Sequence, residues 1–252
     1  MMQLQNISKA FGGLAALSQI SFRVKSGEVL GVIGPNGAGK TTLFNLMTGV
    51  IGPSSGDIRF KEQSLLGLKP HQVTERGIAR TFQNIRLFGH LSARENVMIG
   101  AHCRLQTGIW QGVWRTSAQR REETAVRQQA DELLEFMGLT DVAATTAGSL
   151  PYGKQRRLEI ARALATSPSL LLLDEPTAGM NEKETAELSD LIKQIQARGK
   201  TVILIEHDMQ LVMNICDRLV VLNFGKKIAE GQPREIQQHP AVIEAYLGQE
   251  GA

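Results

Sequence analysis

Two patterns of apolar and polar residues follow one another along this chain of 252 residues. Residues 2–7 and 20–24 alternate apolar with polar side chains, as strands do when only one face is buried. Residues 29–33, 169–173 and 201–205 are continuous apolar runs. Such runs are typical of strands that are covered on both faces, so we expect a buried parallel sheet beside half-buried strands.

Helical periodicity separates these strands. Residues 119–137 carry apolar side chains at helical spacing and end before Gly138, a residue suited to a helix C-terminus. We expect further helices at 41–47, 154–165, 182–198 and 209–216, and further strands at 57–60, 78–82 and 218–222. The pattern predicts one domain, with an α/β core of residues 1–86 and 159–252 and a helical insertion at about 87–158.

Composition excludes several classes of protein. The net charge of +3 is mild and does not indicate a nucleic-acid binder. Cys103 and Cys216 lie far apart, which fits neither a metal cluster nor a disulfide framework. We expect no secretory signal, and no apolar run approaches the roughly 18 residues that span a bilayer.

The segment after the first apolar run carries the clearest chemistry. It matches the phosphate-binding pattern Gly-x4-Gly-Lys-Ser/Thr, with residues Gly34, Pro35, Asn36, Gly37, Ala38, Gly39, Lys40, Thr41 and Thr42. Glycines let backbone N–H groups approach a polyphosphate, Lys40 can reach the β- and γ-phosphates, and the Thr41 hydroxyl is the expected Mg²⁺ ligand. A glycine-rich turn is the alternative, but the strand before and the helix after disfavour it.

Two more apolar runs end in candidate catalytic residues. Asp174 and Glu175 follow one run, so Asp174 would reach the Mg²⁺ shell and Glu175 would orient or deprotonate the attacking water. A charged turn is the alternative for this pair alone. His207 ends another run and could bind the γ-phosphate or the water, although an isolated histidine is more often structural.

The order of these motifs resembles the nucleotide-binding subunit of an ABC transporter. The motifs are the phosphate loop, Gln83, Leu150-Pro-Tyr-Gly-Lys-Gln155, the strand ending in Asp174-Glu175, and His207. The resemblance covers essentially the whole chain. It implies a phosphate-loop α/β core with a mostly parallel sheet, an antiparallel β subdomain and a helical subdomain.

The same resemblance assigns further roles. Phe11 matches the aromatic residue that stacks on adenine, with a buried phenylalanine under a loop as the alternative. Gln83 matches the glutamine that links Mg²⁺ to the membrane-subunit contact, and residues 178–181 match a loop that touches the opposite subunit. Residues 84–98 are our candidate permease contact, or else core of the helical subdomain.

The family signature, usually Leu-Ser-Gly-Gly-Gln, corresponds to Leu150, Pro151, Tyr152, Gly153 and Lys154. In the family it opens a helix and caps the ATP held by the other subunit. Pro151 suits a first helical turn, but it replaces the serine and so removes a hydroxyl and an N–H donor. We therefore hypothesise that the two ATP sites are unequal.

Four segments are closer to one group within the family. Residues 10–17, 80–88, 205–208 and 245–248 are similar to the ATP-binding subunits of branched-chain amino-acid importers, a group that includes importers of urea and short amides. The resemblance implies ATP and Mg²⁺ as cofactors, and hydrolysis coupled to solute uptake. It also implies permease subunits, a second and related ATPase chain, indirectly an external solute-binding protein, and no nucleic acid. The location would be peripheral, on the cytoplasmic face of the inner (plasma) membrane.

Three rival interpretations stay open at this point. A soluble ABC ATPase of DNA repair or translation would carry coiled-coil insertions or two phosphate loops, and the chain has neither. A lipopolysaccharide-export ATPase has a similar layout, but Tyr152 and residues 80–88 disfavour it. A non-catalytic subunit would not need Lys40, Asp174 and Glu175, although Pro151 keeps that possibility alive.

Overall fold

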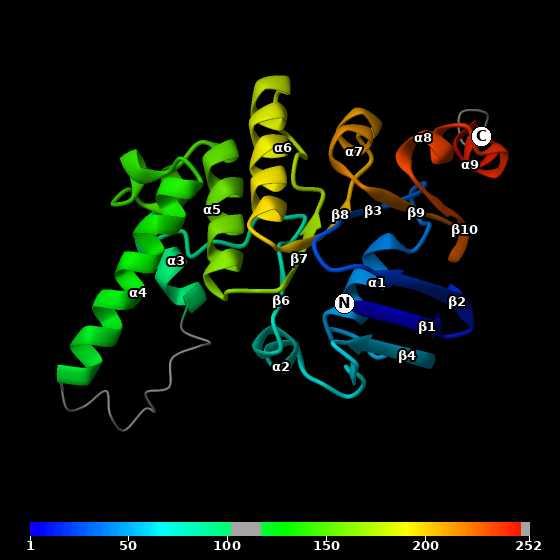
Figure 1. Ribbon diagram of the computed structural model, residues 1–252, viewed down its shortest axis with the longest axis horizontal. Coiled ribbons are helices and arrows are strands. Elements are labelled where there is room, and N and C mark those ends of the chain that lie inside the picture. Colours follow the sequence, from blue (N-terminus) through cyan, green and yellow to red (C-terminus); the bar gives the residue numbers. More distant parts are fainter. Residues whose placement is uncertain (102–116, 248–252) are drawn as a thin grey trace.

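A computed structural model describes residues 1–101 and 117–247 of the chain (Figure 1). Its centre is a six-stranded sheet in the order β10-β9-β3-β8-β7-β6. The strands are β3 (Val29–Ile33), β6 (Ile78–Arg80), β7 (Leu170–Asp174), β8 (Thr201–Ile205), β9 (Arg218–Asn223) and β10 (Lys226–Gly231). All neighbours pair in parallel except β9 and β10, so the predicted parallel sheet has one antiparallel edge.

Alternate residues of the central strands enter two separate cores. Leu30 and Val32 of β3 face a core that contains α1 (Lys40–Met47), whereas Val29 and Ile33 face the other core. The second core contains α6 (Glu182–Ala197) and α7 (Met209–Ile215). Both faces are therefore covered, which explains the continuous apolar runs.

The half-buried strands form a second sheet, in the order β2-β1-β4-β5. They are β1 (Met2–Phe11), β2 (Leu14–Val24), β4 (Ser55–Phe60) and the two-residue β5 (Gln63–Ser64), all antiparallel. Apolar side chains of β1 share a core with α1, so this helix lies between the two sheets.

Helices α3 (Ala93–Ala101), α4 (Ser117–Phe136) and α5 (Tyr152–Ala165) pack against one another on the side away from the second sheet (Figure 1). Gly138, with φ of 67°, follows α4 as predicted. Two 3-10 turns, Thr140–Val142 and Ala147–Ser149, lead into α5. Residues 102–116 of the predicted helical insertion, with Cys103, lie outside the described residues, so the domain boundaries stay a prediction.

Short elements complete the chain. Helix α2 (Pro70–Glu75) precedes β6, and α8 (Pro233–Gln237) and α9 (Pro240–Leu247) follow β10. Gly248, at the end of the family-like tail, lies outside the described residues. The buried strands lie close to their predicted bounds. Strands β3 and β8 cover the expected residues, and β6 ends two residues early.

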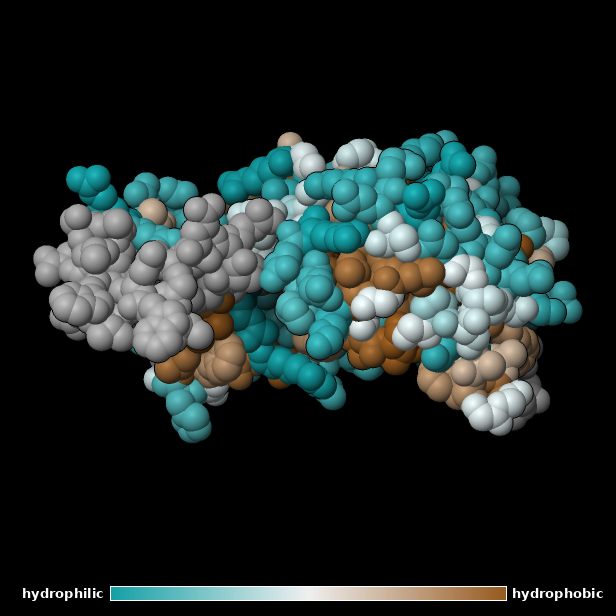
Figure 2. Space-filling model, turned by 90° about the horizontal axis from the view of Figure 1, so that it is seen from below, coloured by the Kyte–Doolittle hydropathy of each residue, from teal (hydrophilic) through white to brown (hydrophobic). Residues whose placement is uncertain are grey.

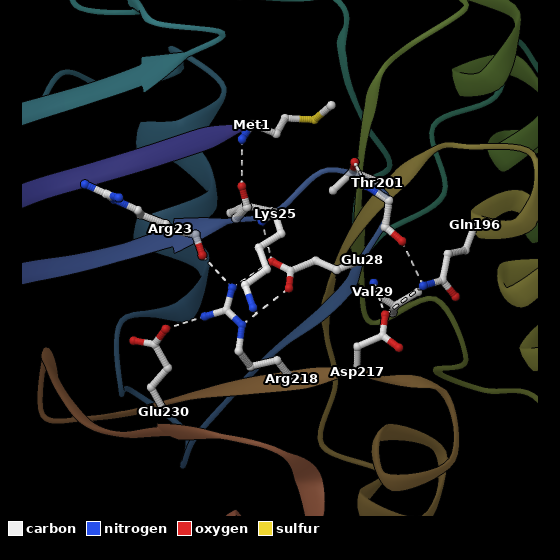
Figure 3. Close-up of polar contacts among 12 residues, drawn as sticks. Met1, Arg23, Lys25, Glu28, Val29, Gln196, Thr201, Asp217, Arg218 and Glu230 are labelled. Carbon is white, nitrogen blue, oxygen red and sulfur yellow. Dashed lines mark hydrogen bonds and ion pairs between the residues drawn. The ribbon is translucent and has the colours of Figure 1, made fainter.

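A polar network joins the two sheets at the amino end of β3, opposite the phosphate loop (Figure 3). The Arg218 guanidinium pairs with Glu28 at 2.7 Å and with Glu230 of β10. It also donates a hydrogen bond of 2.5 Å to the carbonyl of Arg23 in β2. Branched contacts of this kind suit a guanidinium, and here they connect Arg218 to β2, to β10 and to the residue before β3.

The surface seen from below is mainly hydrophilic, with a hydrophobic patch to the right of its centre (Figure 2). Across residues 1–101 and 117–247, no helix combines the length and the apolar character needed to cross a membrane.

Candidate nucleotide-binding site

A pocket of about 600 Å³ opens at the carboxyl end of β3, the expected place for a ligand in a parallel sheet. It is lined by Leu14, Ala15, Ala16, Asn36, Gly37, Ala38, Gly39, Lys40, Thr41, Thr42, Gln83, Glu175, Phe224 and Gly225. Most of the predicted phosphate loop therefore meets Gln83 and Glu175 in one cavity. Its volume lies in the range of small-molecule sites.

Backbone geometry restricts two of the loop positions to glycine. Gly34 has φ of 149°, and a Cβ there would lie 2.1 Å from the Leu222 carbonyl oxygen. Gly39 has φ of 102° and serves as the N-cap of α1. Helix α1 therefore begins directly at the pocket, and its first N–H groups have no acceptor within the helix. Such a terminus attracts anions, so the loop fits a polyphosphate.

The Lys40 ammonium is held close to the loop itself. Its Nζ donates to the carbonyl oxygens of Gly34 at 2.5 Å and Pro35 at 2.9 Å. Burial lowers the pKa of Lys40, while the negative charges of Glu175 and Asp174 oppose that shift. A polyphosphate would offer this cation anionic acceptors in place of two neutral carbonyls.

Asp174 lies at the end of β7 with its carboxylate buried. It pairs with Arg80 of β6 at 2.8 Å, and Arg80 also donates to Asn45 of α1 at 2.6 Å. Asp174 is not among the described residues that line the pocket, whereas Thr41 and Gln83 are. Arg80 is an unpredicted member of the site, because nothing in its local sequence distinguishes it from a surface arginine.

The oxygen donors near the loop fit a small hard cation. Thr41 and Gln83 line the same pocket, and Asp174 ends β7, which is two strands away from β3 in the sheet. In the described part of the chain, no three His, Cys, Asp or Glu side chains are grouped to hold a metal. Mg²⁺ needs few protein carboxylates when phosphate oxygens complete its shell, so this donor set suits it.

Glu175 and Gln83 meet at the mouth of the pocket. The Gln83 side-chain amide donates to Glu175 Oε2 at 2.8 Å, although the residues lie 92 positions apart. Glu175 has φ of 45°, a conformation that side-chain-bearing residues rarely adopt. Strained residues of this kind cluster at functional sites, which supports a role for Glu175 in chemistry.

Glu206, which no sequence motif singled out, lies between His207 and the loop after Glu175. Glu206 is buried and accepts hydrogen bonds from the Thr177 backbone N–H at 3.1 Å and hydroxyl at 2.6 Å. The His207 side chain is 67% exposed, and its Nδ1 lies 3.9 Å from Glu206 Oε2. It is not among the described pocket-lining residues, so its contact with a phosphate stays a prediction.

The large apolar residues that line the pocket are not the one predicted from the sequence. Phe11 is 49% exposed and is not among the described residues that line the cavity. Leu14 and Phe224 do line it, and they are 74% and 85% exposed. The turn that carries Phe224 is fixed to the phosphate loop, because Gly225 N–H donates to the Ala38 carbonyl at 3.1 Å.

The signature lies apart from this pocket. Pro151 was expected in the first turn of the helix, but it is the N-cap of α5, one position earlier. Its ring makes no capping hydrogen bond to the described residues. Gly153 is buried against Glu184 of α6, and Lys154 pairs with Asp141 at 2.7 Å. Within the described chain, none of residues 150–154 lines the pocket.

Comparison with known families identifies the family of this protein. Residues 17–178 match the model of the ABC transporter family. The chain belongs to the ABC transporter family. Residues 226–252 also match a family described as branched-chain amino acid ATP-binding cassette transporter.

Members of this ABC family align with the chain over nearly its full length. The high-affinity branched-chain amino acid transport ATP-binding protein BraF of Pseudomonas aeruginosa is 45% identical over 249 residues, which is 98% of each chain. The corresponding protein LivG of Escherichia coli is 43% identical over 250 residues, covering 99% of this chain and 98% of LivG. The ADP conformation of MJ1267, an ATP-binding cassette of an ABC transporter, superposes with a TM-score of 0.86 at 32% identity, covering 98% of both chains.

These comparisons confirm the predicted family, its ATPase class and the phosphate-loop α/β fold with an antiparallel sheet. They also confirm the likeness to ATP-binding subunits of branched-chain amino-acid importers. ABC cassettes bind nucleotide, as the ADP conformation of MJ1267 illustrates.

Proposed function

We propose that this chain hydrolyses ATP to power an ABC importer, which takes up branched-chain amino acids or related small polar solutes through a membrane permease. The observation that carries the proposal is the contact between Gln83 and Glu175 at a pocket walled by the phosphate loop. The names of BraF and LivG support the solute class.

Each residue of the site has a proposed part in hydrolysis. Lys40 and the N-terminus of α1 bind the β- and γ-phosphates of ATP and stabilise the charge that develops on them. Thr41, Gln83 and Asp174 would hold Mg²⁺, which would neutralise phosphate charge. Glu175 accepts the proton of the attacking water, and His207 orients that water or the γ-phosphate.

A second ATPase subunit completes the site. The chain has one phosphate loop, and its signature lies outside its own pocket, which supports docking of residues 150–154 on the nucleotide of a partner. Pro151 gives that docking helix no side-chain cap, so we propose that the partner's ATP is hydrolysed more slowly. The partner is a related but different chain.

The permease contact is proposed for residues 84–98. Phe88 is 50% exposed and lines a groove with Arg86, Ile99 and Arg162, whereas Val97 is fully buried in the core. Only part of this segment is thus available to another protein. Through that contact the chain sits on the cytoplasmic face of the inner membrane as a peripheral subunit.

Purification of the tagged chain from its native membrane tests this function. We expect permease subunits and a related ATPase to co-purify, and the reconstituted complex to couple ATP hydrolysis to uptake of labelled leucine. The Lys40→Ala variant is the control and should reduce both. ATP hydrolysis without any co-purifying membrane protein would contradict the transport function.

The same complex tests the inequality of the two sites. We expect Lys40→Ala in this chain and the matching lysine change in its partner to reduce transport by different factors. Equal losses would contradict the proposal for Pro151.

A further inference from the structure

Arg156 of α5 is a charged side chain with no exposure to solvent. Its Nη1 donates to the Phe82 carbonyl at 2.7 Å and to Glu159 at 3.0 Å. Its Nη2 donates to the Gln83 carbonyl at 2.7 Å and to the Tyr152 hydroxyl at 3.1 Å. The Nε of Arg156 has no partner among the described residues. The four contacts of its two terminal nitrogens nevertheless anchor the buried guanidinium and fix its position.

The backbone around Gln83 is held from both sides by this pair. Arg156 binds the carbonyl oxygens of Phe82 and Gln83, while Glu159 Oε1 lies 3.4 Å from the Phe82 N–H and 3.3 Å from the Arg86 N–H. The side chain of Gln83 in turn touches Glu175 at 2.8 Å. The position of Arg156 therefore sets how Gln83 presents its amide to Glu175.

Tyr152 is the exposed end of the same arrangement. It belongs to the signature and is 44% exposed, yet its hydroxyl reaches the buried Arg156. Its ring packs on Gly179, where an added Cβ would lie 3.3 Å from Tyr152 Cε1. Gly179 lies four residues after Glu175, in the loop that we expect to touch the opposite subunit.

We propose that Tyr152 and Arg156 are positioning residues that connect the signature to Gln83 and, through Gln83, to Glu175. The inference rests on the proposed function, in which the signature docks on the partner's nucleotide. Docking there moves or fixes the Tyr152 side chain, Arg156 transmits the change to the backbone of Gln83, and hydrolysis at this chain's own site responds. Occupancy of one ATP site thereby adjusts the rate at the other.

The variant Tyr152→Phe isolates this connection, because it keeps the ring on Gly179 and removes only the hydroxyl. The free energy of a hydrogen bond to a charged group corresponds to a change of about tenfold in a rate constant. We expect kcat for ATP hydrolysis by the assembled complex to fall about tenfold, with KM for ATP within about twofold of wild type. ATP affinity of this chain's own pocket should be preserved, because Tyr152 is not among the described residues that line it.

A double-mutant cycle with Gln83→Ala separates positioning from general stability. If Tyr152 acts through Gln83, then adding Tyr152→Phe to Gln83→Ala lowers kcat no further. The matched control is Arg157→Ala, which removes the neighbouring arginine of α5 and its pair with Glu187, and should leave kcat unchanged. The kcat values of all variants are measured at one temperature that lies below the lowest Tm among them.

Two results would overturn the inference. One is an unchanged kcat for Tyr152→Phe, and the other is a pair of losses that multiply in the double variant. Wild-type ATP hydrolysis and transport would stand in both cases, so failure of this inference is distinct from failure of the proposed function, in which the wild-type complex itself is inactive.

Discussion

Replacement of Arg80 by methionine tests whether a buried ion pair holds Asp174 at the nucleotide site. The two side chains are 8% and 5% exposed, and Arg80 Nη2 lies 2.8 Å from Asp174 Oδ2. The guanidinium carbon also lies 5.5 Å and 5.4 Å from the ring centroids of Phe44 and Phe82. Methionine keeps apolar bulk but is shorter than arginine and also loses the hydrogen bond to Asn45. Arg80→Met therefore leaves the Asp174 carboxylate buried without its cation.

Burial determines the expected magnitude. Loss of one partner from a buried pair costs about 3–5 kcal/mol of unfolding free energy. The pair of Arg94 and Asp131 is shorter, at 2.6 Å, but its side chains are 27% and 45% exposed. An exposed pair is worth about 0–1 kcal/mol, so Arg94→Met is a matched control that should change little.

Calorimetric melting of the purified chain measures the difference. For a domain of this size, each kcal/mol shifts Tm by about 2–4 °C, so we expect Arg80→Met to melt roughly 6–20 °C lower and Arg94→Met less than about 4 °C lower. Addition of Asp174→Asn to Arg80→Met should restore part of the loss, because an amide carries no charge. Equal shifts for the two arginine variants, or no recovery with Asp174→Asn, would refute the reasoning.

Two further predictions concern the phosphate loop and the core. Gly34→Ala should lower Tm far more than Gly37→Ala, because a Cβ at Gly34 would meet the Leu222 carbonyl at 2.1 Å, whereas a Cβ at Gly37 would meet nothing within 4 Å. The Gly37 variant should lose only about 1 kcal/mol, from its φ of 76°, and equal melting of the two would contradict this account. Burial raises the pKa of the Cys216 thiol to about 12, so the native protein should react slowly with a thiol reagent at pH 8. In a Cys103→Ser background, we expect the reaction to be orders of magnitude faster in high urea. Equal rates in both conditions would show that the thiol is exposed.

The elements that the sequence predicted well are those whose pattern is local. Residues 29–33 form β3 with the expected bounds, because a short apolar run between a turn and a glycine loop leaves few alternatives. Helix α2 has six residues and escaped prediction, since so short a segment shows no periodicity. Strand β10 escaped because it is an edge strand with a partly polar sequence.

The site was predictable wherever a motif carries its own chemistry. The phosphate loop and Glu175 were found in this way, and the structure brings them together with Gln83 in one pocket. Arg156 and Glu159 were not found, because an Arg and a Glu three positions apart on a helix normally indicate a solvated face. Here both are buried, and the backbone groups that they bind lie more than 70 positions away, which no local pattern reveals.

The central claim is that Glu175 accepts the proton of the attacking water at an ATP site built on Lys40 and Gln83. Single-turnover hydrolysis by the assembled complex, measured beside ATP affinity in Glu175→Gln, tests it most directly. We predict hydrolysis slower by about two to four orders of magnitude, with the Kd for ATP nearly unchanged. Normal turnover in Glu175→Gln would contradict the account.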